Sequence, residues 1–232
     1  MILRAALLAL LTVLPSVARA QIEPARGGVR ADGIAAVVGG TAPGPDVDVI
    51  LQSDVDLRAR IHLAGQTEGP LPTGPIPADL MRATLDEIVG EALIAREAAR
   101  VRVAEPSADE VAEEMTRLER GAGGADRLDE VLRMLGTSRR ELEAVARRRA
   151  AVQAFLRANL EGSTVIGDAE LERVYEAGEH PYEGRPFEEV ADELRAWLSQ
   201  RALRRAVRRW VEVLRARTPV RLLAPYAEKD SD

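Results

Sequence analysis

Short strand-like segments lie at the two ends of this chain, and most of the sequence between them has a helical pattern. Residues 34–38 (I-A-A-V-V) and 47–51 (V-D-V-I-L) are apolar or alternating runs separated by glycines and prolines, which is typical of a hairpin with a long loop. Pro219 ends the last helical segment, and residues 220–223 (V-R-L-L) follow it. Because a two-stranded hairpin alone is marginally stable in water, we expect this last segment to join the first two in one small antiparallel sheet.

Seven segments between these strands show the three- and four-residue apolar spacing of amphipathic helices. Capping boxes, Ser107 with Glu110 and Ser138 with Glu141, open two of them, and Gly136 is placed to end the segment before the second box. The predicted helices cover approximately residues 53–64, 78–101, 107–120, 128–135, 138–160, 168–175 and 186–218. The sequence therefore predicts a mostly α fold, a helical body with a small antiparallel sheet.

The first 20 residues have the pattern of a cleavable export signal. Arg4 lies in a short basic start, residues 5–14 form an apolar core, and residues 18–20 (A-R-A) provide the small-residue exit. We expect cleavage after Ala20. The apolar core is shorter than the ~20 residues that cross a bilayer, so we expect no stable membrane insertion.

We expect the rest of the chain to form one domain at residues 34–224, after a flexible N-terminal segment at 21–33 and before a polar tail at 225–232. Residues 65–77 hold four prolines and three glycines, so neither a helix nor a central strand is expected there. This stretch is either a mobile exposed loop or a docking segment for a partner. The chain has no cysteine, so its stability in an oxidising compartment must come from packing.

No residue pattern indicates a catalytic or metal site. The chain holds two histidines, His62 and His180, and neither has a second ligand at metal-binding spacing. The serine-hydrolase motif G-x-S-x-G and the common nucleotide-binding glycine loops are absent. Adjacent carboxylates such as Glu113 and Glu114 are predicted to lie on solvent faces. We therefore expect no catalytic residue, no metal and no cofactor.

The charge balance is acidic, with 32 basic against 38 acidic side chains and a formal net charge of −6. This balance disfavours nucleic acid as a partner. Two arginine clusters run against it, at residues 147–149 and at Arg201, Arg204, Arg205, Arg208 and Arg209. We interpret both clusters as salt-bridged solvent faces, with phosphate or anionic lipid binding as the alternative. The expected pairing acids lie on the same predicted helices and are Glu141, Glu143, Asp192, Glu193 and Glu212.

Six segments resemble, in order, the chaperone domain of SurA-type periplasmic chaperones. They are I-A-A-V-V-G-G at 34–40, I-L-Q-S-D-V-D-L-R at 50–58, L-D-E-I-V-G-E-A-L-I-A-R-E-A at 85–98, V-Q-A-F-L-R at 152–157, D-A-E-L-E-R-V-Y at 168–175 and W-V-E-V-L-R-A-R-T-P-V-R-L-L at 210–223. The ordered series carries the resemblance, since no single segment is specific. The resemblance implies a periplasmic protein that binds unfolded outer-membrane polypeptides without ATP.

Members of that family insert parvulin prolyl isomerase modules before the returning last helix. The corresponding place in this chain, residues 176–186, holds eleven residues, far too few for a parvulin domain. The resemblance therefore implies a chaperone body without an enzyme. The alternatives are an isomerase-related protein with residual activity and a structural subunit of an envelope assembly or secretion complex.

Methionines adapt to varied partners, so those near apolar helix stripes are candidates for a client-binding groove. With neighbouring leucines, the candidate peptide-binding residues are Met81, Leu85, Met115, Leu118, Met134 and Leu135. The alternative is that all six belong to the core. The sequence makes no prediction of the oligomeric state.

Overall fold

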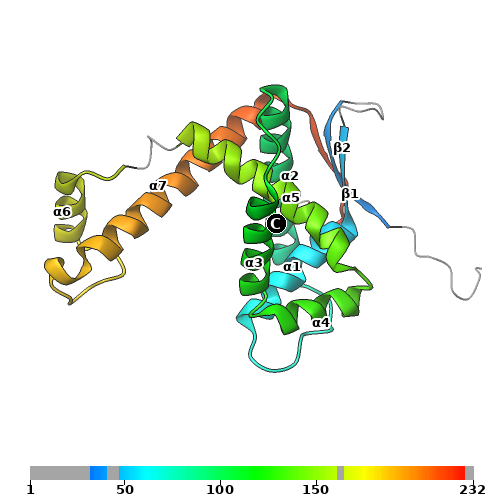
Figure 1. Ribbon diagram of the computed structural model, residues 1–232, viewed down its shortest axis with the longest axis horizontal. Helices are drawn as coiled ribbons and strands as arrows, with labels where there is room; N and C mark the ends of the chain where they lie inside the picture. Colours follow the sequence, from blue (N-terminus) through cyan, green and yellow to red (C-terminus); the bar gives the residue numbers. More distant parts are fainter. Residues whose placement is uncertain (1–31, 41–46, 161–164, 228–232) are drawn as a thin grey trace, which may run out of the picture. The chain divides into compact units, whose positions relative to one another are not determined.

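The computed structural model describes residues 32–40, 47–160 and 165–227. The predicted signal at 1–20, most of the N-terminal segment at 21–33 and the end of the polar tail lie outside these ranges. The described residues form seven helices and a three-stranded antiparallel sheet, so the predicted fold class is confirmed (Figure 1).

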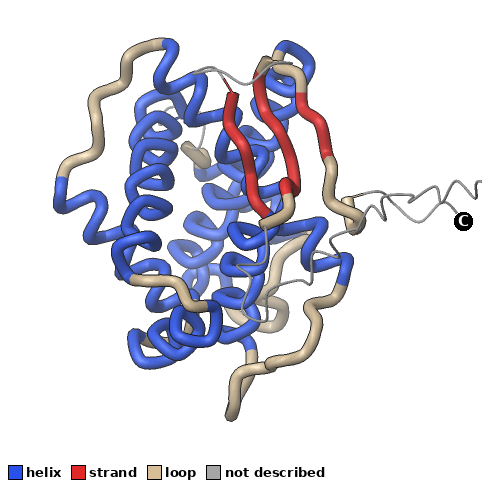
Figure 2. Tube along the Cα trace, turned by 90° about the vertical axis from the view of Figure 1, so that its right-hand side faces the viewer, coloured by secondary structure: helices blue, strands red, loops and turns tan. Residues whose placement is uncertain are grey.

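The sheet joins the first and last elements of the described chain. Strands β1 (Ile34–Gly39), β2 (Val47–Leu51) and β3 (Val220–Leu222) lie in the order β2-β1-β3, with both pairs antiparallel. Val37 stands at the centre, paired with Val49 on one side and Arg221 on the other. Figure 2 shows the three strands side by side beside the helices. The prediction that the last strand adds to the N-terminal hairpin is confirmed.

The helices follow the predicted segments closely. Their bounds are α1 Gln52–Gln66, α2 Ala78–Arg100, α3 Ala108–Gly121, α4 Ala125–Leu135, α5 Arg139–Leu160, α6 Asp168–Glu176 and α7 Phe187–Arg217. The capping boxes at Ser107 and Ser138 and the C-cap at Gly136 are all present. Ser107 Oγ accepts from the Glu110 amide at 3.2 Å, and Gly136 ends α4 in the left-handed region at φ 66°. These local signals position the helix ends because they satisfy backbone groups that the helix itself leaves unpaired.

The proline- and glycine-rich loop after α1 is exposed over most of its length but is tied to the helices. Leu71 is buried, and Arg60 donates hydrogen bonds to the carbonyl oxygens of Pro72 and Gly74. Arg127 of α4 donates to three more carbonyl oxygens at the end of α1 and in the loop. Helix α1 also extends two residues past its predicted end, to Gln66.

Three clusters of buried apolar side chains hold the described elements together. The first joins the sheet to α2, α5 and the end of α7, the second joins α1 to α3, α4 and α5, and the third joins α6 to the first half of α7. Helix α5 contributes to two clusters, through Phe155 in the first and Leu142 in the second. None of the helices in the described ranges combines the length and apolar character required to cross a bilayer.

Candidate peptide-binding groove

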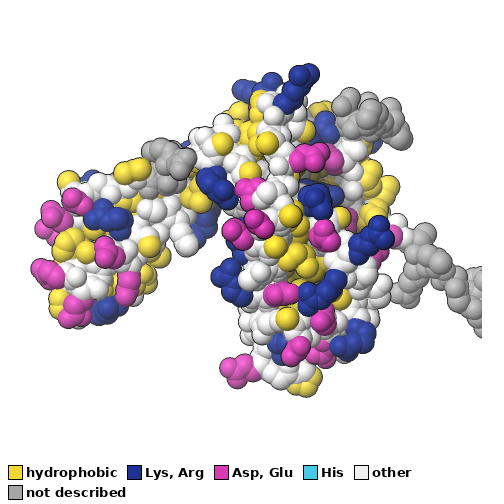
Figure 3. Space-filling view, viewed as in Figure 1, with side chains coloured by type: hydrophobic (Ala, Val, Ile, Leu, Met, Phe, Trp, Pro, Cys, Tyr) yellow, Lys and Arg dark blue, Asp and Glu magenta, His cyan; other side chains and the backbone are white. Residues whose placement is uncertain are grey.

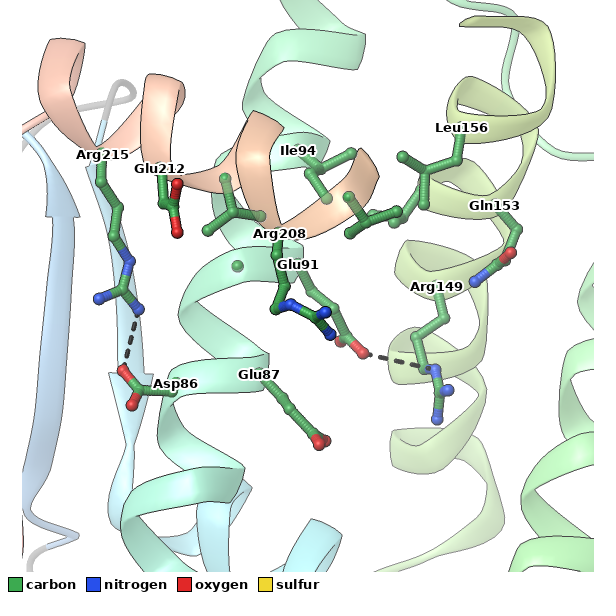
Figure 4. Close-up of a pocket in the computed structure, with 14 residues that line it drawn as sticks. Asp86, Glu87, Glu91, Ile94, Arg149, Gln153, Leu156, Arg208, Glu212 and Arg215 are labelled. Atoms are coloured by element: carbon green, nitrogen blue, oxygen red, sulfur yellow. Dashed lines mark hydrogen bonds and ion pairs between the residues drawn. The ribbon is translucent and has the colours of Figure 1, made fainter. Parts of the chain in front are cut away.

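Helices α2, α5 and α7 enclose a groove with a volume of about 590 Å³. Its apolar lining comes from all three helices and consists of Gly90, Ile94, Val152, Leu156, Val207 and Val211. Charged side chains stand around this lining, as Figure 4 shows. An apolar floor inside a polar rim is the usual character of a site that binds an apolar group and fixes its orientation.

Gly90 of α2 faces Val211 of α7 within the groove. A Cβ atom at this position would lie 3.5 Å from Cγ2 of Val211, an ordinary van der Waals contact. Because Gly90 has no side chain, α2 presents bare backbone to α7 at this point of the groove. The absent side chain leaves part of the groove volume open.

Paired charges form part of the groove rim. Arg215 of α7 lies 2.9 Å from Asp86 of α2, and Arg149 of α5 lies 3.7 Å from Glu91 of α2. Both pairs connect different helices across the groove (Figure 4). They therefore help hold the three helices at their separation, although the more exposed pair, Arg215 with Asp86, contributes little to stability.

The other charged rim residues have no ion pair within the described part of the chain. These are Glu87 on α2 and Arg208 and Glu212 on α7. In Figure 4 the side chain of Arg208 extends from α7 toward Glu91 and the space between α2 and α5. This guanidinium is available to an acidic group entering the groove.

An ion-pair network lies beneath the rim and continues from the groove into the core. Arg58 of α1 makes a bidentate pair with Glu91, at 2.8 and 3.0 Å. Burial alone lowers the pKa of Arg58, but its hydrogen bond with Glu91 and the negative charge of that carboxylate outweigh this and raise the pKa. Arg149 lies 2.8 Å from Glu114, whose other oxygen accepts from Arg117 at 2.5 Å. The network thus connects α1, α2, α3 and α5.

The sequence prediction for Glu114 was wrong. Its side chain is 1% exposed, although it was expected on a solvent face beside Glu113. A signal for burial was present, because Glu114 follows Val111 by three residues and precedes Leu118 by four, on the apolar stripe of α3. A carboxylate in such a stripe needs cationic partners, and Arg149 and Arg117 supply them.

Five of the six residues proposed from the sequence as a groove belong to two different clusters, the sixth belongs to neither, and none lines the groove of α2, α5 and α7. Leu85 is buried in the first cluster and Leu118 in the second. Met81 packs against the first cluster, while Met115 and Leu135 pack against the second. Met134 is exposed. The structure therefore does not bring the six together.

Met115 lines a second hollow, of about 440 Å³, between α3 and the start of α5. This hollow is a second candidate for a peptide-binding site. This hollow also contains exposed polar residues, among them Thr116 and Arg140. It is smaller than the groove of α2, α5 and α7, and its lining comes from two helices instead of three. We therefore take the larger groove as the candidate site.

The two histidines lie apart from the groove. His62 is exposed on α1. His180 is half-buried, stacks on Tyr175 with ring centroids 5.0 Å apart, and accepts from the Tyr182 amide at 3.1 Å. Within the described ranges, no group of three or more His, Cys, Asp or Glu side chains is arranged to hold a metal ion.

Apolar side chains are visible between charged ones on the molecular surface in Figure 3. The groove is thus one part of a mixed surface and has a volume of about 590 Å³. Comparison with known proteins adds no assignment, because neither a protein-family model nor a curated protein matches the sequence.

Proposed function

We propose that this protein is an ATP-independent periplasmic holdase, which binds unfolded client polypeptides, outer-membrane proteins among them, in the groove of α2, α5 and α7. The observation that carries the proposal is the apolar lining supplied by three helices inside a charged rim. The resemblance of the ordered sequence segments to SurA-type chaperones and the export-signal pattern at 1–20 support the same function.

The size of the groove suits weak, reversible binding of short apolar segments. Its volume of about 590 Å³ lies within the ~300–1,000 Å³ typical of ligand pockets, enough for a few side chains. Burial of ~400 Å² of apolar client surface is worth ~10 kcal/mol before association costs, which are of similar size. The small net affinity allows release of the client without nucleotide hydrolysis.

The test is suppression of client aggregation. A chemically unfolded β-barrel protein is diluted into buffer with the chain at near-equal concentration, without nucleotide, and light scattering is followed. We expect suppression by the native chain and its loss in Val207→Glu, because a carboxylate would then stand on the half-buried apolar lining. Met115→Glu reports separately on the second hollow and is expected to retain suppression.

A matched control is available on the same helix. Val213 of α7 is 47% exposed and does not line the groove, so Val213→Glu makes the same chemical change outside the site. Circular dichroism melts of both variants separate loss of binding from loss of folding. If Val207→Glu melts like the native chain and still suppresses aggregation, the groove is not the client site.

The two alternative functions predict different results. A residual prolyl isomerase would accelerate cis/trans conversion of a proline peptide above the uncatalysed rate, and we expect no acceleration. A structural subunit would co-purify with one folded partner and would leave the scattering of unfolded clients unchanged. Either result would replace the holdase proposal.

A further inference from the structure

Helix α7 carries an arginine row next to the groove, and its neighbours do not neutralise it. The segment 201–209 (R-A-L-R-R-A-V-R-R) holds five arginines and no acidic residue, in a chain of net charge −6. Four of the five, Arg204, Arg205, Arg208 and Arg209, are exposed, and Arg201 lies over the Trp197 ring at 5.2 Å. We call these five side chains the arginine row.

The predicted salt bridges of this cluster are not formed. Glu193 pairs with Arg185 instead, at 2.9 Å, and neither Asp192 nor Glu212 makes an ion pair within the described residues. Arg204 has one weak contact, 3.5 Å from Gln200 Oε1. The interpretation of the row as a salt-bridged face was therefore wrong, and it keeps its positive charge.

The row continues a stripe that α7 uses for packing. Leu194 and Leu198, buried against α6, are followed at spacings of three, four and three residues by Arg201, Arg205 and Arg208. In the second half of α7, the opposite side of the helix packs into the first core cluster through Val207, Trp210, Val211 and Leu214. One side of α7 is therefore apolar in its first half and cationic in its second.

We propose that the groove recognises acid-flanked apolar peptides, polypeptide segments in which aspartate or glutamate residues lie next to an apolar stretch. This inference rests on the proposed function and defines its client class. The apolar stretch occupies the groove, and the acidic flank lies along α7 against Arg201, Arg204 and Arg205. Arg208 lines the groove, has no ion pair in the described part, and belongs to the arginine row, so it connects the groove to the row.

The geometry of a helix sets the spacing of such a segment. Arg204 precedes Val211 by seven residues and Arg201 precedes it by ten, which correspond to ~10 and ~15 Å along α7. An extended peptide covers these distances in about three to five residues. The acids should therefore lie about three to five positions to one side of the apolar anchor. Acids on the other side would approach Glu212, which follows Val211 directly on α7 and has no ion pair in the described part, so the preference should be asymmetric.

A polypeptide fits this surface better than a membrane does. Leu203, the one exposed large apolar residue between Arg201 and Arg209, lies on a different side of the helix from the stripe of Arg201, Arg205 and Arg208. The arginine row therefore lacks the adjacent apolar face that a helix needs to insert into a lipid surface. The groove beside it is an apolar site of limited volume, which suits a peptide segment.

The experiment measures fluorescence anisotropy of labelled peptides that share one leucine- and valine-rich centre and carry aspartate, serine or lysine on either flank. We expect the native chain to bind the aspartate peptide of preferred polarity about tenfold more tightly than the lysine peptide, from a few exposed ion pairs. The variant Arg204→Glu/Arg205→Glu should reverse this order. It should bind the serine peptide as the native chain does, because neither residue lines the groove.

The control variant Arg102→Glu/Arg120→Glu makes the same change of net charge at exposed arginines away from α7, one in the turn after α2 and one on α3, without an ion pair in the described ranges. It should keep the native preference. Equal affinity of the native chain for the aspartate and lysine peptides, with the serine peptide bound, would overturn the client class and leave the holdase proposal standing. Failure to bind any of the peptides would overturn both.

Two further outcomes also decide the inference. If Val207→Glu binds the aspartate peptide as tightly as the native chain does, the arginine row acts without the groove and the inference is wrong. If phosphatidylglycerol vesicles are bound through Arg204 and Arg205 while the peptides are not discriminated, the row is a membrane contact and the inference is again wrong. Retained folding of each variant is checked by its melting temperature.

Discussion

At the scale of single residues, Glu114 is the one charged residue that is buried in the described part of the chain. Its side chain is 1% exposed, whereas Arg149 and Arg117, its partners, are 26% and 42% exposed. A buried carboxylate must be paired, since unpaired burial of charge is costly. Through Arg149, which also lines the groove, Glu114 helps to fix the position of a rim residue.

We expect Glu114→Gln to lower the free energy of unfolding by about 1–3 kcal/mol, because the charge that pairs with Arg117 and Arg149 is lost while the shape is kept. The neighbouring change Glu113→Gln is the control. Glu113 is 64% exposed and lies 3.4 Å from Arg117, so its loss should cost at most ~0.5 kcal/mol. Urea denaturation measures both. Equal effects of the two variants would show that the buried pairs contribute no more than the exposed one.

Residue-level predictions from the sequence succeeded where the signal comes from neighbours in the chain. They failed where a side chain's ion-pair partners depend on how the elements pack together. Ser107 and Gly136 act within their own helix ends, so their roles could be predicted from neighbours in the chain. The partner of Glu114 on α5, and the lack of an ion pair for Arg205 within the described residues, depend on side-chain placement between elements. Proximity in the sequence predicted ion pairs for the arginine row that the structure does not form.

At the scale of elements, two glycines mark where helices approach each other, and their surroundings differ. A Cβ atom on Gly65, near the end of α1, would lie 2.0 Å from the carbonyl oxygen of Gly121. Backbone atoms of α3 cannot move aside without separating the two helices. A Cβ atom on Gly90 of α2 would make ordinary contact with Val211 at 3.5 Å.

We therefore expect opposite results from the same substitution. Gly65→Ala should lower the free energy of unfolding by about 1–3 kcal/mol through overpacking of α1 against α3. Gly90→Ala should be neutral or stabilising by up to ~1 kcal/mol, because alanine has the higher helix propensity and space is available. Denaturant titration of both variants is the measurement. A stabilised Gly65→Ala protein would mean that α1 and α3 do not approach as closely as the structure shows.

The helices themselves could be predicted from apolar spacing, but the groove could not. Its lining comes from α2, α5 and α7, which are brought together only when the last helix returns to the sheet. Methionine content directed the sequence prediction toward Met81 and Met115, whereas the groove is lined by valine, isoleucine, leucine and one glycine as its apolar residues. In sequence alone, Gly90 is an ordinary residue within a helix; its role depends on Val211, which lies far along the chain.

At the scale of the whole molecule, carboxylates on three different helices make the stability of the fold depend on pH. A hydrogen bond from Arg100 lowers the pKa of Glu97, a hydrogen bond from Arg139 lowers that of Asp129, and the Ser138 amide and hydroxyl lower that of Glu141. Each group holds its proton more weakly in the folded chain than in the unfolded one. The stability that they contribute is present above the unfolded pKa values of 3.8 to 4.5 and is lost as pH falls through the lower folded values.

The melting temperature should therefore fall as pH is lowered from 6 to 3, and Glu141→Gln should reduce the size of that fall. Glutamine can still close the capping box with Ser138 but does not titrate in this range, so the variant removes one acid-linked contribution while keeping the helix start. Glu188→Gln, at an exposed carboxylate of α7 without an ion pair among the described residues, is the control and should leave the fall unchanged. Calorimetric melts of the three proteins at each pH provide the measurement. An equal fall in all three would mean that the start of α5 remains formed as the protein unfolds in acid, and that the sensitivity arises at other carboxylates.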